Sequence, residues 1–329
     1  MTEPLLAHAT ERGRMYSRSV AEPPQVPSIT TVIAQAQSSS LGGWFGYMAA
    51  SALAQDPRLA ASLGNAGEMR AVIQDASKAA ERYRDDAAQR GTRVHSYCEQ
   101  VALRALGRPD RLEDARTELT QHGEGAFAAR FDEWWDLYQV KPIAPEITVW
   151  NSELGYAGTL DLVATIGGRL CIIDFKTRAT DRDGMVKPLD EKVVMQLVAG
   201  MKAQESLVDP HTGSWEPWKY GSDPILLAVA VGQTEVRAHR ANPEVLREHW
   251  FKFCALRRAW EAGSNAAVAG RPLLPVPPPP RTAAVGVPAA PAGSPGSVTS
   301  PSSDQASASG SGAADQVGEI GLPVSSTGS

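Results

Sequence analysis

Residues 157–176 read AGTLDLVATIGGRLCIIDFK, and this stretch decides the fold. Residues 157–166 and 170–176 are two runs rich in β-branched and apolar side chains, which is typical of β-strands. Gly167-Gly168 separates the two runs. Two glycines in that place are a strong signal for a two-residue hairpin turn, because such turns need positive φ angles. We therefore expect an antiparallel hairpin.

The turn fixes which residues face each other across the hairpin. Ile166 is expected to face Arg169, and the same register places Asp161 directly opposite Asp174. Opposed side chains have Cβ atoms about 4.5–5.5 Å apart. Two carboxylates at that distance repel each other and need a shared proton, a basic partner or a bound cation. Lys176 shares the face of Asp174, and the oxygen ligands suit Mg²⁺ or Mn²⁺.

A second interpretation of the Asp-x-Lys triplet is that it marks a solvated face, as such triplets in strands usually do. The run from Leu170 to Ile173 is strongly apolar, however, which is typical of a central strand. Charged side chains at the end of a buried strand need a reason, and the opposed Asp161 makes a metal site the favoured interpretation.

The rest of the chain before Gly270 mixes helical and strand patterns. The order predicts an α/β or α+β domain with a central mixed sheet flanked by helices. The expected helices are 66–90, 92–106, 125–138, 190–204 and 243–262, and the expected strands are 143–150, 157–166, 170–176, 225–231 and 235–239. We expect Trp134 and Trp135 to lie in the core rather than to stack on bases.

Composition limits the classes of function. The net charge of −5 argues against a protein that coats nucleic acid by bulk electrostatics, but a carboxylate-rich metal site remains compatible with it. The sequence contains neither a run of apolar residues that could cross a bilayer nor a secretory signal pattern, so we expect a cytoplasmic protein without membrane partners. Cys98, Cys171 and Cys254 are too few and too widely spaced for a zinc site, and are expected to be reduced.

The segment 271–329 differs sharply from the rest. It has no aromatic residue and no lysine, and Pro, Ala, Ser and Gly occupy 39 of its 59 positions. Such a segment cannot bury enough apolar surface to offset its conformational entropy, so we expect a disordered tail after a domain at 1–270. A passive linker is favoured over a tail that binds a recombination partner protein.

Several motifs resemble those of one nuclease superfamily. The hairpin, with Gly158-Thr159-x-Asp161 and Asp174-Phe175-Lys176, is similar to the core of PD-(D/E)XK nucleases, and in particular to the RecB-like branch with its phage and CRISPR-associated exonucleases. That branch also has a helical Gly-x-x-x-His motif, an acidic residue on the preceding strand and a helical glutamine. The matching residues here are Gly91 and His95, Glu146 and Gln196, and the segment 27–33 resembles the start of phage-type members.

The resemblance implies a restriction-endonuclease-like core and a set of roles. His95, Asp161, Asp174 and the Phe175 carbonyl would hold one or two Mg²⁺ or Mn²⁺ ions. Lys176 would position or deprotonate the attacking water. Glu146 and Gln196 would assist, although Gln196 could equally be a solvated helix residue.

The chain also departs from the family pattern. Gly200 stands where family members often have tyrosine, which puts that residue's role in doubt. Some CRISPR-associated relatives bind an iron–sulfur cluster with four cysteines, and this chain has three, so no cluster is expected. Glu99 follows His95 by one helical turn, and its role stays open. Between Glu146 and Glu153, the alternation along the strand favours Glu146.

Together these features predict a metal-dependent DNA exonuclease that hydrolyses phosphodiester bonds, in recombination, repair or replication. Two alternatives stay open: a non-catalytic DNA-binding module of the same fold, and a site-specific endonuclease. The intact set of Asp161, Asp174 and Lys176 speaks against the former. The lack of a visible specificity domain speaks against the latter.

Overall fold

The computed structural model describes residues 4–36 and 41–278. By compactness the chain divides into a unit of residues 1–272 and a unit of residues 273–329. Most of the tail expected at 271–329, and with it the expectation of a partner-binding segment there, lies outside the described residues. No helix in the described ranges is long and apolar enough to span a membrane. Cys98, Cys171 and Cys254 form no disulfide.

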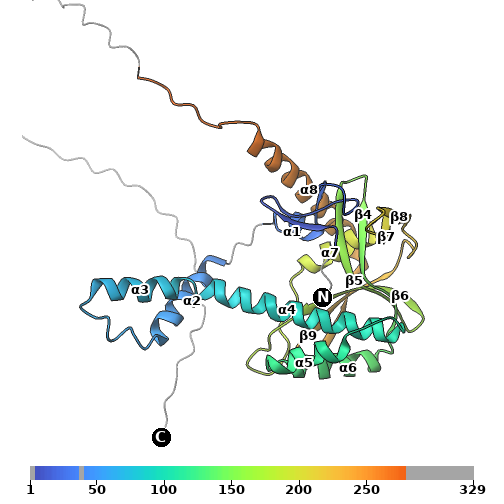
Figure 1. Ribbon diagram of the computed structural model, residues 1–329, viewed down its shortest axis with the longest axis horizontal. Helices are drawn as coiled ribbons and strands as arrows, with labels where there is room; N and C mark the ends of the chain where they lie inside the picture. The colour runs from blue at the N-terminus through green and yellow to red at the C-terminus, as the bar shows by residue number, and fades with distance from the viewer. Residues whose placement is uncertain (1–3, 37–40, 279–329) are drawn as a thin grey trace, which may run out of the picture. The chain divides into compact units, whose positions relative to one another are not determined.

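A seven-stranded mixed sheet forms the centre of the molecule (Figure 1). Its strand order is β10-β9-β6-β5-β4-β7-β8, with β6 and β9 parallel and the other neighbours antiparallel. The mixed sheet flanked by helices confirms the expected α/β class. The strands are β4 (Lys141–Asn151), β5 (Tyr156–Ile166), β6 (Arg169–Thr177), β7 (Glu205–Asp209), β8 (Ser214–Pro217), β9 (Ile225–Val231) and β10 (Val236–Arg240).

The β5–β6 hairpin has the expected register. Gly167 and Gly168 have φ angles of 56° and 76°, as a two-residue turn of this kind requires. Ile166 pairs with Arg169, and the ladder continues in the same register to Leu162 and Ile173. Because both glycines adopt a conformation that other residues rarely do, the local sequence is sufficient to fix this register.

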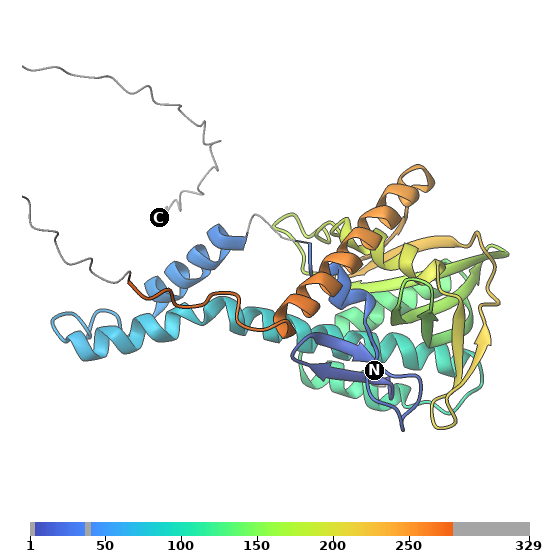
Figure 2. The ribbon, with the colours of Figure 1, turned by 90° about the horizontal axis from the view of Figure 1, so that it is seen from above.

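Helices cover both faces of the sheet (Figures 1 and 2). On one face, α4 and α6 pack against β5, β6 and β9 through one apolar cluster that also includes α5. On the other face, α7 and α8 pack through a second cluster. The helices are α1 (Ile29–Ile33), α2 (Leu41–Gln55), α3 (Ala66–Ser77), α4 (Ala79–Ala105), α5 (Leu112–Gln121), α6 (Gly125–Leu137), α7 (Lys192–Met201) and α8 (Leu246–Val268), the last after a 3₁₀ turn at Pro243–Val245.

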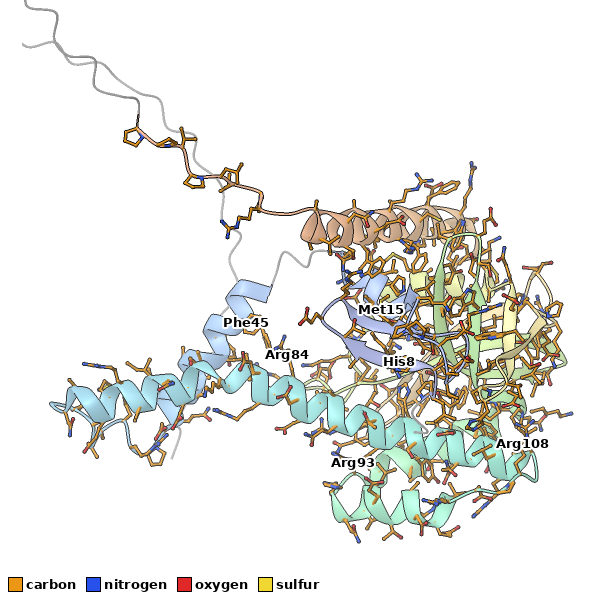
Figure 3. The ribbon with its side chains drawn as sticks, turned by 45° about the horizontal axis from the view of Figure 1, so that its top comes forward. His8, Met15, Phe45, Arg84, Arg93 and Arg108 are labelled. Carbon is orange, nitrogen blue, oxygen red and sulfur yellow. The ribbon has the colours of Figure 1, made fainter. Side chains whose placement is uncertain are left out.

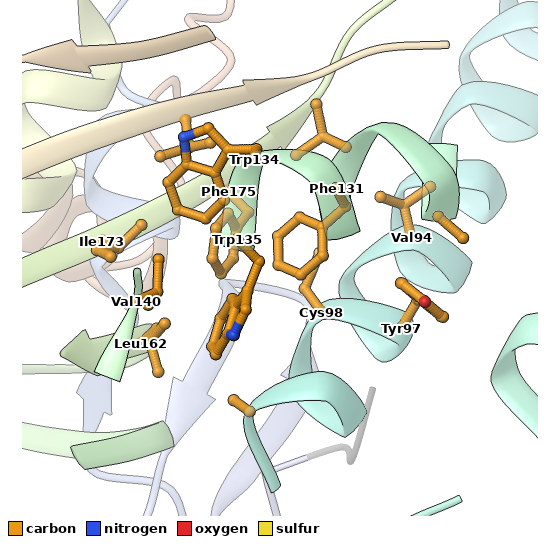
Figure 4. Close-up of a cluster of buried hydrophobic side chains, with 14 of the residues drawn as sticks. Val94, Tyr97, Cys98, Phe131, Trp134, Trp135, Val140, Leu162, Ile173 and Phe175 are labelled. Atoms are coloured by element: carbon orange, nitrogen blue, oxygen red, sulfur yellow. The ribbon is translucent and has the colours of Figure 1, made fainter. Parts of the chain in front are cut away.

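Aromatic side chains fill the first cluster (Figure 4). Trp134 and Trp135 are 3% and 9% exposed, so the expectation that they belong to the core is confirmed. The Phe131 ring lies 5.3 Å from that of Phe175, and Trp134 lies 6.0 Å from Phe175. Edge-to-face pairs at these separations add to the stability gained by burial. These aromatic side chains therefore pack tightly against the centre of the sheet around Phe175.

Three expected helix boundaries are wrong, one of them the end of the last helix, which lies at Val268 instead of residue 262. The sequence predicted one helix to Arg90 and another from Thr92, but α4 runs without interruption through Gly91. The break lies instead at Lys78, whose φ and ψ of −87° and 0° separate α3 from α4. A glycine inside a helix costs about 1 kcal/mol relative to alanine, which packing along the rest of a long helix can offset.

A small sheet precedes the main domain and was not expected. It consists of β1 (Ala7–Thr10), β2 (Gly13–Tyr16) and β3 (Val26–Pro27), and Figure 3 labels His8 and Met15 on its hairpin. The N-terminal residue of α1 follows Ser28, whose hydroxyl caps the helix by accepting from the Thr31 amide at 2.9 Å. Tyr16 joins this sheet to β5 by a hydrogen bond to Thr159 at 2.9 Å.

Candidate active site

Five of the expected site residues line one cavity of about 180 Å³. They come from α4, β4, β5, β6 and α7, so segments far apart in the sequence meet here. The five residues are His95, Glu146, Asp161, Lys176 and Gln196. The two other expected residues are hydrogen-bonded to members of this set: Asp174 to Lys176, and the Phe175 amide to Asp161.

Asp174 and Lys176 form a close ion pair at the end of β6. The Lys176 ammonium lies 2.8 Å from Asp174 Oδ1 and 2.6 Å from Oδ2, and Asp174 is only 4% exposed. Burial raises the pKa of Asp174 to about 6 despite the nearby ammonium. Burial also acts to lower the pKa of Lys176, but Asp174 and Asp161 outweigh it and raise that pKa. Lys176 is therefore held in its charged form.

The direct Asp161–Asp174 pairing expected from the hairpin is wrong in detail. The β5–β6 ladder ends at Leu162 and Ile173. Beyond that point β6 continues its ladder only with β9, and Asp161 Oδ2 accepts a hydrogen bond from the Phe175 amide at 2.7 Å. The carboxylate of Asp161 thus occupies the place where the strands separate, and burial raises its pKa.

His95 brings an imidazole from α4 to the same point. Its Nδ1 lies 3.6 Å from Asp161 Oδ2, and its ring is 6.5 Å from the Phe175 ring. Burial and the Lys176 charge lower the pKa of His95 to about 4, while a hydrogen bond to the Phe175 backbone acts in the opposite direction. The imidazole is therefore neutral at ordinary pH, which is the form that binds metals.

Glu146 reaches the cavity through an unusual backbone conformation. Its φ is +47°, in the left-handed region that glutamate rarely adopts. The flanking pairs, Pro145 with Leu162 and Ile147 with Leu160, place it across from Asp161. Burial, followed by the charge of Asp161, raises the pKa of Glu146 to about 9. Strain of this kind persists where surrounding structure enforces it, and it gathers at functional sites.

The side chains of β5 change face across from Glu146. Leu160 packs in the cluster beneath α7, whereas Leu162 packs in the opposite cluster beneath α4 and α6. In a regular strand these two residues would share a face. The alternation is therefore interrupted at Asp161, between two well-anchored leucines.

Phe175 sets the direction of its neighbours. Its ring is buried among Phe131 and Trp134 on the α6 side of the sheet (Figure 4). Because side chains alternate along β6, Asp174 and Lys176 must point to the other face. The packing of Phe175 in the apolar cluster on one face of the sheet thus fixes Asp174 and Lys176 on the other face.

The N-terminal segment supplies lining residues that the sequence interpretation missed. Arg14, Tyr16, Ser28 and Thr30 all line the cavity. The similarity of residues 27–33 to phage-type nucleases was the signal that could have identified the last two. The short strand that carries Arg14 and Tyr16 has no periodicity long enough to recognise.

The positions of Glu153, Glu99 and Gly200 bear on three questions that the sequence left open. Glu153 lies on an exposed turn, where its backbone amide donates to Gln204, so Glu146 is the acid at the cavity. Glu99 is 6% exposed on α4 and is not among the residues that line the cavity. At Gly200 an added Cβ would lie 2.5 Å from Leu160 Cδ2, so this packing leaves no room for the tyrosine of the family pattern.

The donor set fits a hard divalent cation. Carboxylate oxygens with one neutral imidazole suit Mg²⁺ or Mn²⁺. Within residues 4–36 and 41–278, no group of three or more His, Cys, Asp and Glu side chains has the geometry of an assembled metal site. In the structure Lys176 pairs with Asp174, and the Phe175 amide donates to Asp161. Asp174 Oδ2 is buried and makes no hydrogen bond to the described chain beyond the ion pair.

Comparisons with known proteins add little to this geometry. The sequence matches no protein-family model and no curated protein. Among solved structures, the crystal structure of SSO0001 is similar over 54% of this chain and 82% of that chain, with 11% sequence identity and a TM-score of 0.22. A likeness at that TM-score carries no argument about function.

Proposed function

We propose that the protein is a metal-dependent deoxyribonuclease that hydrolyses phosphodiester bonds at DNA ends. The observation that carries the proposal is the convergence of Glu146, Asp161, Lys176 and the neutral His95 on a single small cavity, with a third acid, Asp174, paired to the lysine. A purely structural protein has no use for buried carboxylates that repel each other. The family resemblance of the same residues supports the same activity.

The residues of the candidate site would have different chemical roles in the proposed hydrolysis. Asp161, Asp174, His95 and the Phe175 carbonyl would hold Mg²⁺ or Mn²⁺, and the bound ion would supply an activated water and neutralise phosphate charge. Lys176 is charged, so it positions the attacking water and the phosphate oxygens rather than removing a proton. Glu146, with a pKa raised to about 9, keeps its proton at neutral pH and is suited to donate it to the leaving oxygen.

The size of the cavity favours DNA ends over an intact duplex. A space of about 180 Å³, bounded by α1 and the β2 strand on one side and α7 on the other, suits one sugar-phosphate unit of a single strand. A duplex is far too wide to enter it. A strand separated from its partner at an end fits this constraint, which supports exonuclease over site-specific endonuclease activity.

Cleavage of end-labelled linear duplex, linear single strands and closed circles, with Mg²⁺ or Mn²⁺, tests the proposal. Full-length protein should degrade the linear substrates and spare the circles, and Asp174→Ala should abolish the activity. Glu153→Ala removes an acid from the exposed turn between β4 and β5 and should leave the activity unchanged. Cleavage of circles would instead indicate an endonuclease. Tight DNA binding without cleavage in either metal would indicate the non-catalytic module.

A further inference from the structure

A second cavity, of about 270 Å³, adjoins the first. The two cavities share Thr30, Lys176 and Gln196. The second extends from these residues along the end of β6 to the start of α7, where Arg178 and Lys192 line it. It therefore continues the candidate active site in one direction, beyond Lys176.

The second cavity carries uncompensated positive charge. Within the described residues, neither Arg178 nor Lys192 forms an ion pair with a carboxylate. Lys192 Nζ makes one long hydrogen bond, 3.4 Å to the Ala36 carbonyl, and one Arg178 nitrogen donates to the Pro188 carbonyl. Asp190 is the acid in the lining, and its Oδ1 accepts from the Lys192 amide at 2.8 Å. The cations thus outnumber the acid.

Two of the residues in the lining carry buried polar atoms without partners. Arg178 Nε and Thr177 Oγ1 are buried and form no hydrogen bond with the described chain. Arg178 Nε can only donate, and the Thr177 hydroxyl can donate as well. A buried donor without an acceptor destabilises a protein, so its persistence needs an explanation. Arg178 is therefore not fully satisfied by its contacts within the described chain.

We propose that this cavity is a second phosphate subsite, which binds a phosphate group of the nucleic-acid strand one nucleotide away from the scissile bond. The assignment rests on the proposed nuclease function. Arg178 and Lys192 would together offer a guanidinium and an ammonium, which match the several oxygens of a phosphate.

The spacing along β6 agrees with this assignment. Lys176 and Arg178 are two residues apart, which corresponds to about 6.6 Å in an extended strand. That length is close to one nucleotide step of an extended single strand. A strand whose scissile phosphate meets Lys176 can therefore present its neighbouring phosphate to Arg178. The phosphate is either an internal phosphodiester or a terminal phosphate, and the chemistry of recognition is the same.

The salt dependence of DNA binding tests the subsite independently of cleavage. Full-length protein in EDTA is titrated with a fluorescent single-stranded oligonucleotide over a range of salt concentrations. Arg178→Gln and Lys192→Gln should each reduce the slope of log K against log salt by about 0.7, the change expected for one lost phosphate contact on a single strand.

Lys187→Gln is the matched control. Lys187 is exposed on the same loop and does not line the cavity, so the variant removes one charge at a comparable place and should retain the wild-type slope. If Lys187→Gln reduced the slope of log K against log salt as much as the other two variants, the proposal would be overturned. That result would show that DNA responds to the general positive charge of the surface rather than to a local contact. Unchanged slopes in Arg178→Gln and Lys192→Gln, or no binding by the wild type in EDTA, would overturn it too. Lys192→Gln stands as an independent test if Arg178→Gln fails to fold.

Oligonucleotides with a terminal phosphate or a terminal hydroxyl identify the source of the phosphate. If the subsite takes a terminal phosphate, wild type should prefer the phosphorylated end and Arg178→Gln should lose that preference. If it takes an internal phosphodiester, Arg178→Gln should weaken both ligands equally. Both results support the subsite. Absence of cleavage with Mg²⁺ or Mn²⁺, alongside reduced slopes, would refute the proposed nuclease and retain the phosphate subsite.

Discussion

Glu146 combines two unfavourable features at one position. Its backbone is in the left-handed region, which costs of order 1–3 kcal/mol for a residue other than glycine. Its carboxyl is also brought toward the charge of Asp161. Neither feature stabilises the fold, so both are expected where a side chain is held for its chemistry.

The charge of Glu146 gives a testable dependence of stability on pH. Its pKa is about 9 in the folded chain, against about 4.3 in an unfolded one. As the pH rises through that window, the unfolded state has already released the proton and the folded state has not, so stability falls. Glu146→Gln lacks this titration. In EDTA, the free energy of unfolding of the variant minus that of the wild type should therefore increase as the pH rises. Urea unfolding at several pH values measures the difference.

The same variant should lose activity. Cleavage with Mg²⁺ should fall at least about tenfold, as for other residues that support a metal site. A variant that is active, or one less stable than wild type across the whole pH window, would give Glu146 a structural role instead.

Individual site residues were predictable to different degrees. The two-glycine turn fixed the register near Asp161 and Asp174, and alternation placed Lys176 beside Asp174. The separation of β6 from β5 was not predictable, because it depends on the pairing of β6 with a strand some fifty residues later in the chain. The positive φ of Glu146 has no local signal either, since nothing in the neighbouring sequence requires it.

At the level of elements, α1 approaches β5 closely at Gly158. A Cβ there would lie 2.6 Å from Ile29 Cδ1 and 3.0 Å from Cγ1. Gly158→Ala should therefore reduce the free energy of unfolding by about 1–3 kcal/mol, because the helix must move away from the strand. Adding Ile29→Val removes the Cδ1 atom and should restore part of the loss. Denaturant unfolding of both variants checks the contact, and failure of the rescue would place the strain elsewhere.

Gly91 within α4 is the opposite case. A Cβ there would meet nothing within 4 Å, and the residue is helical. Gly91→Ala should raise the free energy of unfolding by about 0.5–1 kcal/mol, because alanine loses less backbone entropy in a helix. Thermal and urea unfolding measure the gain. A loss of stability would contradict a helix that is continuous through this position.

Long and strongly patterned elements were predictable from the sequence. The five expected strands agree with β4, β5, β6, β9 and β10 to within two residues at each end. The strands β1–β3, β7 and β8 have five residues or fewer, too short for a periodic signal, and α1, α2 and α5 were also missed. The apolar composition of α2 contains no polar face to mark its period, and none of its described side chains from residue 42 onward is buried.

For the molecule as a whole, the described apolar core belongs to the unit of residues 1–272. All four buried clusters lie within it, and the last of their buried residues is Phe253. A chain that ends at Pro272 should therefore unfold cooperatively at the same midpoint as the full chain, as measured by circular dichroism. A lower midpoint would show that residues 273–329 contribute to the folded core.

The uninterrupted α4 joins the candidate site to a cluster of aromatic residues. Tyr83 lies on α4, 5.9 Å from Trp44 of α2, and Arg84 lies over the Phe45 ring at 5.5 Å (Figure 3). His95 follows Tyr83 by twelve residues of the same helix, an axial rise of about 18 Å. Because no break intervenes, a molecule held at the aromatic cluster stays at a set distance from the imidazole. The continuous helix α4 therefore fixes the distance between Tyr83 in the aromatic cluster and His95 in the candidate site.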